Sequence, residues 1–423
     1  MEGDVPKKRY DVVIFGATGF TGQFVVKELV RTTETEPGLT WAVAGRTMDK
    51  LQKVLTSTTG KDSDSVPVII ADVSSYQSLL DMCQQAKVVI NCVGPFNLYG
   101  EQVIKACIES KASHVDISGE PSYLEKTQLL YTAKAREAGV YIVGSCGFDS
   151  IPAEMGVVFT KKNFDGDLNS IECFVSCITT ESIAVNYGTF ESAVHGFSMQ
   201  GELATVRKTL FPTPLPRSNH KLQKRSLIFF SEEVNKWCLP FPGSDRSVVN
   251  RTQRFNFDVK KERPVQFSPY ICFPSFLSAM MVALFAIIFG IMTKFGFTRN
   301  LLLKYPSFFT NGVFTKQGPT KKQIESTSVC LTFIGRGYSK KLDDPSATHD
   351  EVPDKTITTK VMGPEPGYVT TPICIVQAAL CILKEKDKLP KEGGVYTPGA
   401  AFADTDLIDR LTKNNIKFEV VSP

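Results

Sequence analysis

The feature that most constrains this chain is a short apolar run that ends in a glycine-rich turn and continues into a helical pattern. Residues 10–15 form the run, GATGFTG (residues 16–22) forms the turn, and residues 23–31 have helical spacing. A continuous apolar run of this length is typical of a strand buried on both faces. Glycines let the backbone approach a pyrophosphate, and the free N–H groups at a helix start stabilise its charge. The sequence therefore predicts a dinucleotide site at this turn.

Further apolar runs and helical patterns alternate over the first 150 residues. Helical patterns begin near Met48 and Tyr76, between the second and third runs and between the third and fourth. The five later runs are residues 40–44, 67–71, 87–91, 113–117 and 140–143. This alternation predicts a parallel, doubly wound Rossmann sheet that binds its ligand at the carboxyl ends of the strands. The glycine-rich segment after the last run, residues 144–152, predicts the crossing into a second domain.

The residue that follows the second run indicates which dinucleotide is bound. A site selective for NAD carries an acid there that bonds the ribose hydroxyls. This chain has Arg46 instead, after Gly45, and a cation at this place suits the 2′-phosphate of NADP(H). We therefore expect NADP(H) to be favoured over NAD(H). Asp72 ends the third run, and Asn91 to Pro95 end the fourth, where the nicotinamide half would lie.

Composition narrows the function classes. The chain has 423 residues, 42% of them hydrophobic, and a net charge of +4 with no concentrated basic patch, which argues against a nucleic-acid partner. The eleven cysteines include no Cys-x-x-Cys pair, and no Cys/His cluster has zinc spacing. We therefore expect free thiols in a cytosol-facing protein with no metal site. No secretory or transit signal precedes residue 10, so we expect a protein that is not secreted.

Several separated motifs resemble the saccharopine dehydrogenase family. In chain order they are GATGFTGQ, WAVAGR, INCVGPF, YGEQVIKACI, HVDISGE, GFDSIPAEMG, GPEPGYVTTPICIVQAALCIL and GGVYTPGAAF. Together they cover nearly the whole chain. The resemblance implies a Rossmann fold that is completed by the C-terminal segment and interrupted by an α+β substrate domain. The family also resembles bacterial reductases that act in trans on lipid intermediates.

The resemblance also implies domain bounds and cofactor contacts. The Rossmann domain would be residues 1–152 plus 368–423, the substrate and dimer domain 153–265 plus 306–367, and an apolar lipid-inserting segment 266–305. Arg46 would meet the adenosine phosphate, Asp72 would lie by the adenine, and residues 91–95 would lie by the nicotinamide ribose. The expected cofactor contacts are Gly16, Thr18, Gly19, Phe20, Thr21, Gly22, Arg46, Asp72, Asn91, Val93, Gly94 and Pro95.

One late segment has no charge at all. Residues 271–292, ICFPSFLSAMMVALFAIIFGIM, would form a helix about 33 Å long, against a hydrocarbon core of about 30 Å. A buried core helix is the alternative, but few core helices are apolar on every face. Because motifs of the Rossmann domain return after this segment, both of its ends should stay on one side. Pro274 and Gly290 could break the helix. We therefore expect monotopic insertion through residues 271–304 into a cytosol-facing bilayer leaflet or lipid-droplet monolayer.

The reacting groups are less clearly marked than the cofactor site. Short-chain dehydrogenases use Tyr-x-x-x-Lys, and no tyrosine here has a lysine four residues on. Asp149, Ser150 and Tyr99 are the candidates for an acid or polar role, with Glu120 beside them, although a helix cap or a turn would use the same residue types. No converging cluster of Arg or Lys stands out for a multiply charged amino acid such as saccharopine.

We therefore expect an NADP(H)-dependent oxidoreductase with a small, hydrophobic, lipid-derived substrate. Two alternatives stay open: a non-catalytic NADPH-binding scaffold or redox sensor on lipid droplets, and a soluble saccharopine-type amino-acid dehydrogenase. Fold analogy with two-domain dehydrogenases also suggests a homodimer.

Overall fold

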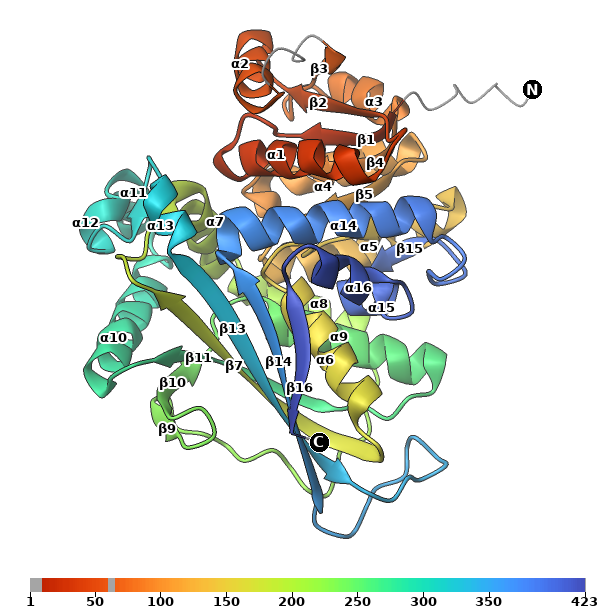
Figure 1. Cartoon of the computed structure of the whole chain (residues 1–423), viewed down its shortest axis with the longest axis vertical. Helices are drawn as coiled ribbons and strands as arrows, with labels where there is room; N and C mark the ends of the chain where they lie inside the picture. Colours follow the sequence, from red (N-terminus) through yellow and green to blue (C-terminus); the bar gives the residue numbers. More distant parts are fainter. Residues whose placement is uncertain (1–9, 60–64, 423) are drawn as a thin grey trace.

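The computed structural model describes residues 10–59 and 65–422. In this part of the chain two seven-stranded sheets and a two-stranded ribbon are found, and helices lie between and around the two large sheets (Figure 1). One apolar core runs from the first sheet through the helices to the second sheet. The two sheets are therefore halves of one packed body.

The first sheet is entirely parallel, with the strand order β15-β6-β5-β4-β1-β2-β3. Its strands are β1 (Tyr10–Phe15), β2 (Trp41–Gly45), β3 (Val68–Ile70), β4 (Ala86–Asn91), β5 (Ser113–Asp116), β6 (Tyr141–Val143) and β15 (Gly394–Tyr396). The order 3-2-1-4-5-6 is that of a Rossmann sheet. The prediction of a doubly wound parallel sheet is confirmed, and each predicted strand lies within two residues of its place.

Helices cover both faces of this sheet, as the predicted alternation requires. On one face the apolar core includes residues of α1 (Phe20–Thr35), α2 (Met48–Thr59) and α14 (Thr371–Lys384). On the other face it includes residues of α3 (Tyr76–Gln84), α4 (Phe96–Glu109) and α5 (Pro121–Ala138). Apolar residues on successive positions of β1 point to opposite faces, so both layers of helices are held by the same strands.

The C-terminal segment completes the first sheet. β15 pairs with β6 in parallel, with Val395 opposite Ile142, and the amide of Gly394 donates to the carbonyl of Val140 over 2.9 Å. The preceding α14, with the π-helical turn η3 (Pro366–Thr370), is long and apolar enough to cross a membrane, but 78% of it is buried inside the protein. This segment is therefore a core helix of the fold.

The second sheet has the order β16-β14-β13-β7-β11-β10-β9, and all its pairs are antiparallel except β7 with β11. Its strands are β7 (Asp167–Thr179), β9 (Phe229–Ser231), β10 (Lys236–Pro240), β11 (Gln266–Phe273), β13 (Thr327–Tyr338), β14 (Lys355–Pro364) and β16 (Lys417–Ser422). Helix α6 (Ile151–Asn163) covers one face so closely that a Cβ on its Gly156 would lie 2.1 Å from Phe333. Only glycine fits this contact.

Two of the predicted domain bounds do not match this pairing. Residues 417–422, assigned to the Rossmann domain, form β16, which pairs with β14 of the second sheet. After α16 (Leu407–Lys413) the left-handed Asn415 turns the chain away from the first sheet. Residues 266–273, assigned to the lipid-inserting segment, form β11, which pairs with both β7 and β10. Both errors arise because strand pairing is decided by distant parts of the chain.

The apolar helix is shorter than the sequence predicts. It is α10 (Phe276–Met292), with 17 residues, because residues 271–273 belong to β11 and Ser275 caps the helix start through Ser278. Pro274 precedes the helix, as expected, whereas the prediction that Gly290 could break it is wrong.

The remaining elements are α7 (Tyr187–Ser198), α8 (Gln200–Leu210), α9 (Asp245–Phe255), η2 (Asn256–Lys260), α11 (Gly296–Lys304), α12 (Pro306–Phe309), α13 (Lys321–Glu325), α15 (Pro398–Phe402) and the ribbon strands β8 (Val185–Asn186) and β12 (Phe314–Thr315).

Candidate active site

The glycine turn has the geometry that a bound pyrophosphate needs. Gly16 has φ +85°, and a Cβ there would lie 2.7 Å from Val93. A Cβ at Gly22 would lie 2.1 Å from the carbonyl oxygen of Gly16, so glycine alone lets α1 pack this closely on β1. Gly19 is exposed and begins α1 without a capping side chain, and the first turn of the helix holds no acid. The first amides of α1 are therefore available to an anion.

Arg46 and Asp72 lie at the carboxyl ends of β2 and β3, at the same edge of the sheet as the glycine turn. Arg46 is exposed. Hydrogen bonds from the amide and hydroxyl of Ser74, aided by the charge of Arg46, hold the pKa of Asp72 below its ordinary value. An exposed guanidinium at this edge fits a 2′-phosphate.

The end of β4 presents a buried amide with an unused donor. Asn91 is fully buried, and its Oδ1 accepts a hydrogen bond from the amide of Val93 over 3.0 Å. Its Nδ2 is buried and has no hydrogen-bond partner among the residues that the structure describes. A buried donor without a partner costs about 1–3 kcal/mol, so it is expected to face a ligand acceptor. Together with the glycine turn, this donor fits a dinucleotide that passes over the ends of β1 and β4.

Glu120 has a structural role beside this edge. Its carboxylate accepts hydrogen bonds from the amides of Phe96 and Asn97, each over 2.9 Å, and from the side chain of Asn97. It therefore caps the start of α4, immediately after Gly94 and Pro95. Burial raises its pKa. The alternative of a helix cap is the one that the structure supports for Glu120.

Asp149 and Ser150 lie where the first sheet gives way to the second. The carboxylate of Asp149 rests between two backbone segments: a Cβ at Gly119 would lie 2.8 Å from its Oδ2, and a Cβ at Gly243 would lie 3.2 Å from its Oδ1. Burial raises the pKa of Asp149 to about 6. Ser150 begins α6 but its hydroxyl makes no capping bond. The pair is therefore not explained by helix capping.

Two further buried acids lie near Ser150, and the sequence analysis did not identify either of them. Its hydroxyl lies 3.1 Å from that of Ser244 and donates to Asp245 over 3.2 Å. Burial, with the charge of Asp149, raises the pKa of Asp245 well above its ordinary value. Glu154, on α6, accepts a 2.6 Å hydrogen bond from Thr252, and burial raises its pKa to about 7. Three carboxyl groups thus share one poorly solvated region, where not all can be ionised at once.

The three predicted catalytic residues do not lie together in the structure. It brings Asp149 and Ser150 together with Asp245, whereas Tyr99 lies on α4 with 38% of its surface exposed. The sequence missed Asp245 because its partner lies 95 positions away. Glu154 did carry a signal, an acid within the otherwise apolar start of a helix, IPAEMGVV. Among the described residues no group of three His, Cys, Asp or Glu could hold a metal ion.

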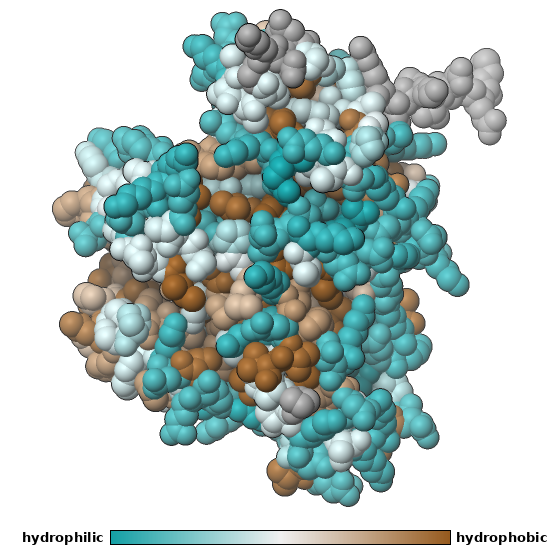
Figure 2. All heavy atoms as spheres, viewed as in Figure 1, coloured by the Kyte–Doolittle hydropathy of each residue, from teal (hydrophilic) through white to brown (hydrophobic). Residues whose placement is uncertain are grey.

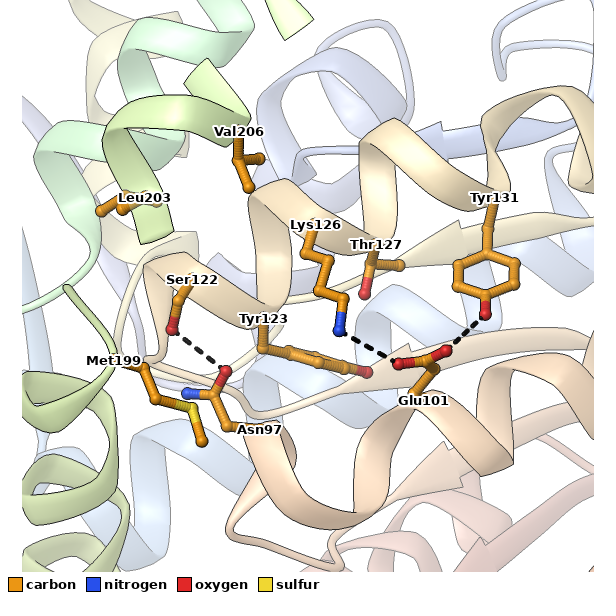
Figure 3. Close-up of a pocket in the computed structure, with 10 residues that line it drawn as sticks. All are labelled: Asn97, Glu101, Ser122, Tyr123, Lys126, Thr127, Tyr131, Met199, Leu203 and Val206. Carbon is orange, nitrogen blue, oxygen red and sulfur yellow. Dashed lines mark hydrogen bonds and ion pairs between the residues drawn. The ribbon is translucent and has the colours of Figure 1, made fainter. Parts of the chain in front are cut away.

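A cavity lies outside this edge, between α4, α5 and α8 (Figure 3). It measures about 220 Å³, and its polar lining is already paired: Tyr131 donates to Glu101 over 2.7 Å, Lys126 lies 3.5 Å from the same carboxylate, and Ser122 donates to Asn97. Its lining residues are Asn97, Glu101, Ser122, Tyr123, Lys126, Thr127, Tyr131, Met199, Leu203 and Val206. The dinucleotide edge is therefore a better candidate for the site than this cavity.

Comparisons with known proteins agree with this geometry. Residues 12–143 match the family model described as the saccharopine dehydrogenase NADP binding domain. The chain is 46% identical to the human saccharopine dehydrogenase-like oxidoreductase, with 98% of each chain covered. It is 42% identical to a Caenorhabditis elegans protein named lipid droplet localized protein, over 98% of this chain and 99% of that one.

A solved structure also shares the fold. The apo saccharopine dehydrogenase (L-Glu forming) of Saccharomyces cerevisiae matches with a TM-score of 0.55 at 16% identity, and the match covers 98% of this chain and 100% of the yeast chain. At this identity the match concerns the fold, and it extends over both sheets.

The buried acids predict a pH dependence of stability. Glu154 holds its proton in the folded state up to about pH 7, against an ordinary value of 4.5. Stability is therefore full below about 4.5 and is lost as the pH rises toward 7, by about 3 kcal/mol at about 1.4 kcal/mol per pKa unit. We expect Glu154→Gln to flatten this decline in urea unfolding measured from pH 4.5 to 8. The exposed Glu137→Gln should keep the wild-type decline, and an unchanged slope in Glu154→Gln would contradict the assignment.

Proposed function

We propose that this chain, which belongs to the saccharopine dehydrogenase family, acts on a hydrophobic, lipid-derived substrate at a phospholipid surface that faces the cytosol. Its relatives and its family model make it an oxidoreductase with NADP(H) as cofactor. The substrate class and the place of action are the parts that we add. The observation that carries them is the exposed apolar face of α10.

Helix α10 directs large apolar side chains to the outside and small ones to the inside. Ala279 and Ala283 are buried against Leu239 of the second sheet. Seven large side chains on the helix are between 47% and 58% exposed: Phe276, Leu277, Met281, Leu284, Ile287, Ile288 and Ile291. Brown and tan spheres gather at the left of the molecule in Figure 2, where Figure 1 has α10. A continuous exposed apolar face of this kind marks a contact surface.

The surroundings of this face suit a lipid surface better than a protein partner. Phe295, Phe297 and Phe308 follow it and are 61–80% exposed. Lys294 and Lys304 are exposed beside them and could meet phosphate headgroups. Seventeen residues make a helix of about 25 Å, short of a hydrocarbon core of about 30 Å. We therefore propose insertion into one leaflet or into the monolayer of a lipid droplet, in keeping with the name of the nematode relative.

The charges where the two sheets meet also favour an apolar substrate over saccharopine. Saccharopine carries several carboxylates, which would need converging cations. Asp149 lies at this junction with Asp245 bonded to the neighbouring Ser150, and Arg251, a buried cation, is already engaged by Gln128. Acids in this position would repel an anionic substrate and are compatible with an uncharged carbonyl or enoyl group.

In the proposed reaction, NADP(H) supplies or accepts the hydride. Asp149 would provide or remove the accompanying proton, since its pKa of about 6 leaves part of the population protonated near neutral pH. The hydrogen bond from Ser150 to Asp245 would hold the neighbouring backbone, and burial keeps the proton on part of the Asp149 population. The packed glycines Gly119 and Gly243 would exclude water from the carboxylate.

Cofactor selectivity provides the first test. Arg46→Ala should weaken NADPH binding roughly tenfold to hundredfold, because it removes a charge-assisted bond to the 2′-phosphate, and should leave NADH binding almost unchanged. The measurement is fluorescence titration with each cofactor. Lys53→Ala, which removes an exposed cation from the neighbouring α2, should bind both cofactors as wild type does. Equal weakening for NADPH and NADH would place Arg46 elsewhere in the site.

Turnover is the test of the substrate class. Wild type on vesicles should consume NADPH with long-chain lipid enoyl or carbonyl compounds, and Asp149→Asn should lower kcat by about 100-fold or more. The exposed Tyr99→Phe should stay within about twofold of wild type if Asp149 is the acid. Oxidation of saccharopine would favour the amino-acid dehydrogenase, and tight NADPH binding without any turnover would favour the scaffold.

Lipid binding is tested separately by flotation. Replacing Leu284, Ile287 and Ile291 together by Ser should abolish co-flotation with vesicles or triolein droplets, since the outer face of α10 would lose its apolar character. The same substitutions should leave NADPH binding in solution intact. As a control, Val352, Val420 and Val421 are exposed valines elsewhere, and their replacement by Ser should leave flotation unchanged. Flotation of the triple α10 variant would contradict the docking surface.

A further inference from the structure

Helix α7 lies between the dinucleotide edge and the lipid-facing helices, and its two faces have different partners. Contacts join it to α4 on one side and to α11 on the other. Residues 190, 194 and 197 fall on one face of the helix, while 192 and 196 fall on the opposite face. This arrangement makes α7 the element through which the two regions can communicate.

The polar face of α7 meets the cofactor edge. Ser192 hydrogen-bonds the carboxylate of Glu120, the residue that caps α4, and its Oγ lies 3.5 Å from where a Cβ of Gly94 would be. One turn on, a Cβ at Gly196 would lie 3.8 Å from the Glu120 side chain. The position of α7 therefore affects the end of the site where the nicotinamide half is expected.

The start of α7 is fixed to the glycine turn. Asn186 caps the helix by accepting from the amide of Gly188 over 3.0 Å. The amide of Asn186 donates to the hydroxyl of Tyr368 over 2.7 Å, and the ring of Tyr368 packs edge-on against Phe20 with centroids 4.8 Å apart. Since Phe20 belongs to the glycine turn, α7 is attached to both ends of the expected dinucleotide path.

The apolar face of α7 packs on the lipid-facing helices. Phe190 and Phe197 lie with ring centroids 5.6 Å and 5.4 Å from that of Phe289 on α10, and Val194 is buried between them and Leu302 of α11. Phe289 is one of the few buried residues of α10, on the side away from the exposed face. Any change in the seating of α10 therefore reaches α7 through aromatic contacts.

We propose that contact of α10 with a phospholipid surface is coupled to cofactor binding through α7, so that docking on lipid tightens the site for NADPH. The coupling rests on the proposed lipid docking and adds its consequence for the cofactor site. A surface that orders α10 favours the packed position of Phe289, and this fixes α7 against Glu120 and Tyr368. Because coupling free energies are reciprocal, NADPH must tighten lipid binding by the same factor.

The test compares NADPH affinity with and without phosphatidylcholine vesicles that contain some phosphatidylserine, and measures flotation on the same samples. Wild type should bind NADPH about fivefold or more tightly when bound to vesicles, and vesicle affinity should rise by the same factor with NADPH. Phe289→Ala keeps the exposed face and should still float, with the change in NADPH affinity reduced to less than about twofold. Phe289→Leu preserves the apolar contact and should retain the coupling if the alanine variant proves unstable.

The outcomes separate the coupling from the docking on which it rests. Wild type that floats but shows the same NADPH affinity on and off vesicles would overturn the coupling and leave the docking surface in place. Wild type that does not float would overturn both. Full coupling in Phe289→Ala, with normal flotation, would also overturn the proposal, since α7 would then not be the connection.

Discussion

The pairing of β15 with β6 is the constraint on which the rest of the molecule depends. The chain leaves the first sheet after Val143 and returns to the same edge at Gly394, where backbone hydrogen bonds and a close glycine contact with Val140 fix it. The chain between Val143 and Gly394 must therefore begin and end at this edge of the sheet. A helix inside this loop, as α10 is, cannot carry the later part of the chain across a bilayer without breaking the sheet. The lipid contact that we propose would therefore be monotopic because of strand pairing as much as because of the length of the helix.

The same return brings the two sheets close enough to share buried acids. Asp149 and Ser150 follow the last strand before the loop, Asp245 begins α9, and Glu154 on α6 lies beside Thr252 and Thr397. Asp149, Ser150 and Glu154 come from one stretch at the start of α6, Asp245 comes from α9, and burial raises the pKa of all three acids. Burial without a dedicated cation raises the pKa of a carboxyl, so the junction costs stability at high pH. A junction of this kind is expected where a proton must be held for a reaction rather than where stability alone is selected.

The first sheet could be predicted closely because strands buried on both faces appear as continuous apolar runs, and its glycine turn has a local steric cause in Gly16 and Gly22. The assignments that failed depend on pairing across long separations. Residues 417–422 gave no local sign that they would pair with β14, and residues 266–273 merged with the apolar helix that follows them. The same limit hid Asp245 and Ser192, whose partners Ser150 and Glu120 lie far away in sequence. The sequence pattern therefore predicts where helices and strands form, whereas contacts between distant parts of the chain determine which of them pack together.

The distribution of large and small side chains on α10 indicates that its exposed face is a contact surface. In a helix that only covers a soluble core, large apolar residues face inward, since each contributes about 1.5–3 kcal/mol when fully buried. Here alanines Ala279 and Ala283 occupy the inner positions over the second sheet, and Leu284 and Ile287 face outward. Enlarging the inner residues would lift the helix from Leu239, and making the outer ones polar would cost the fold little. A sequence that keeps the outer face apolar under these conditions gains its free energy from something outside the chain. The cationic residues Lys294 and Lys304 lie beside that face, and we propose a phospholipid surface as its partner because such a surface would satisfy both the apolar and the charged side chains.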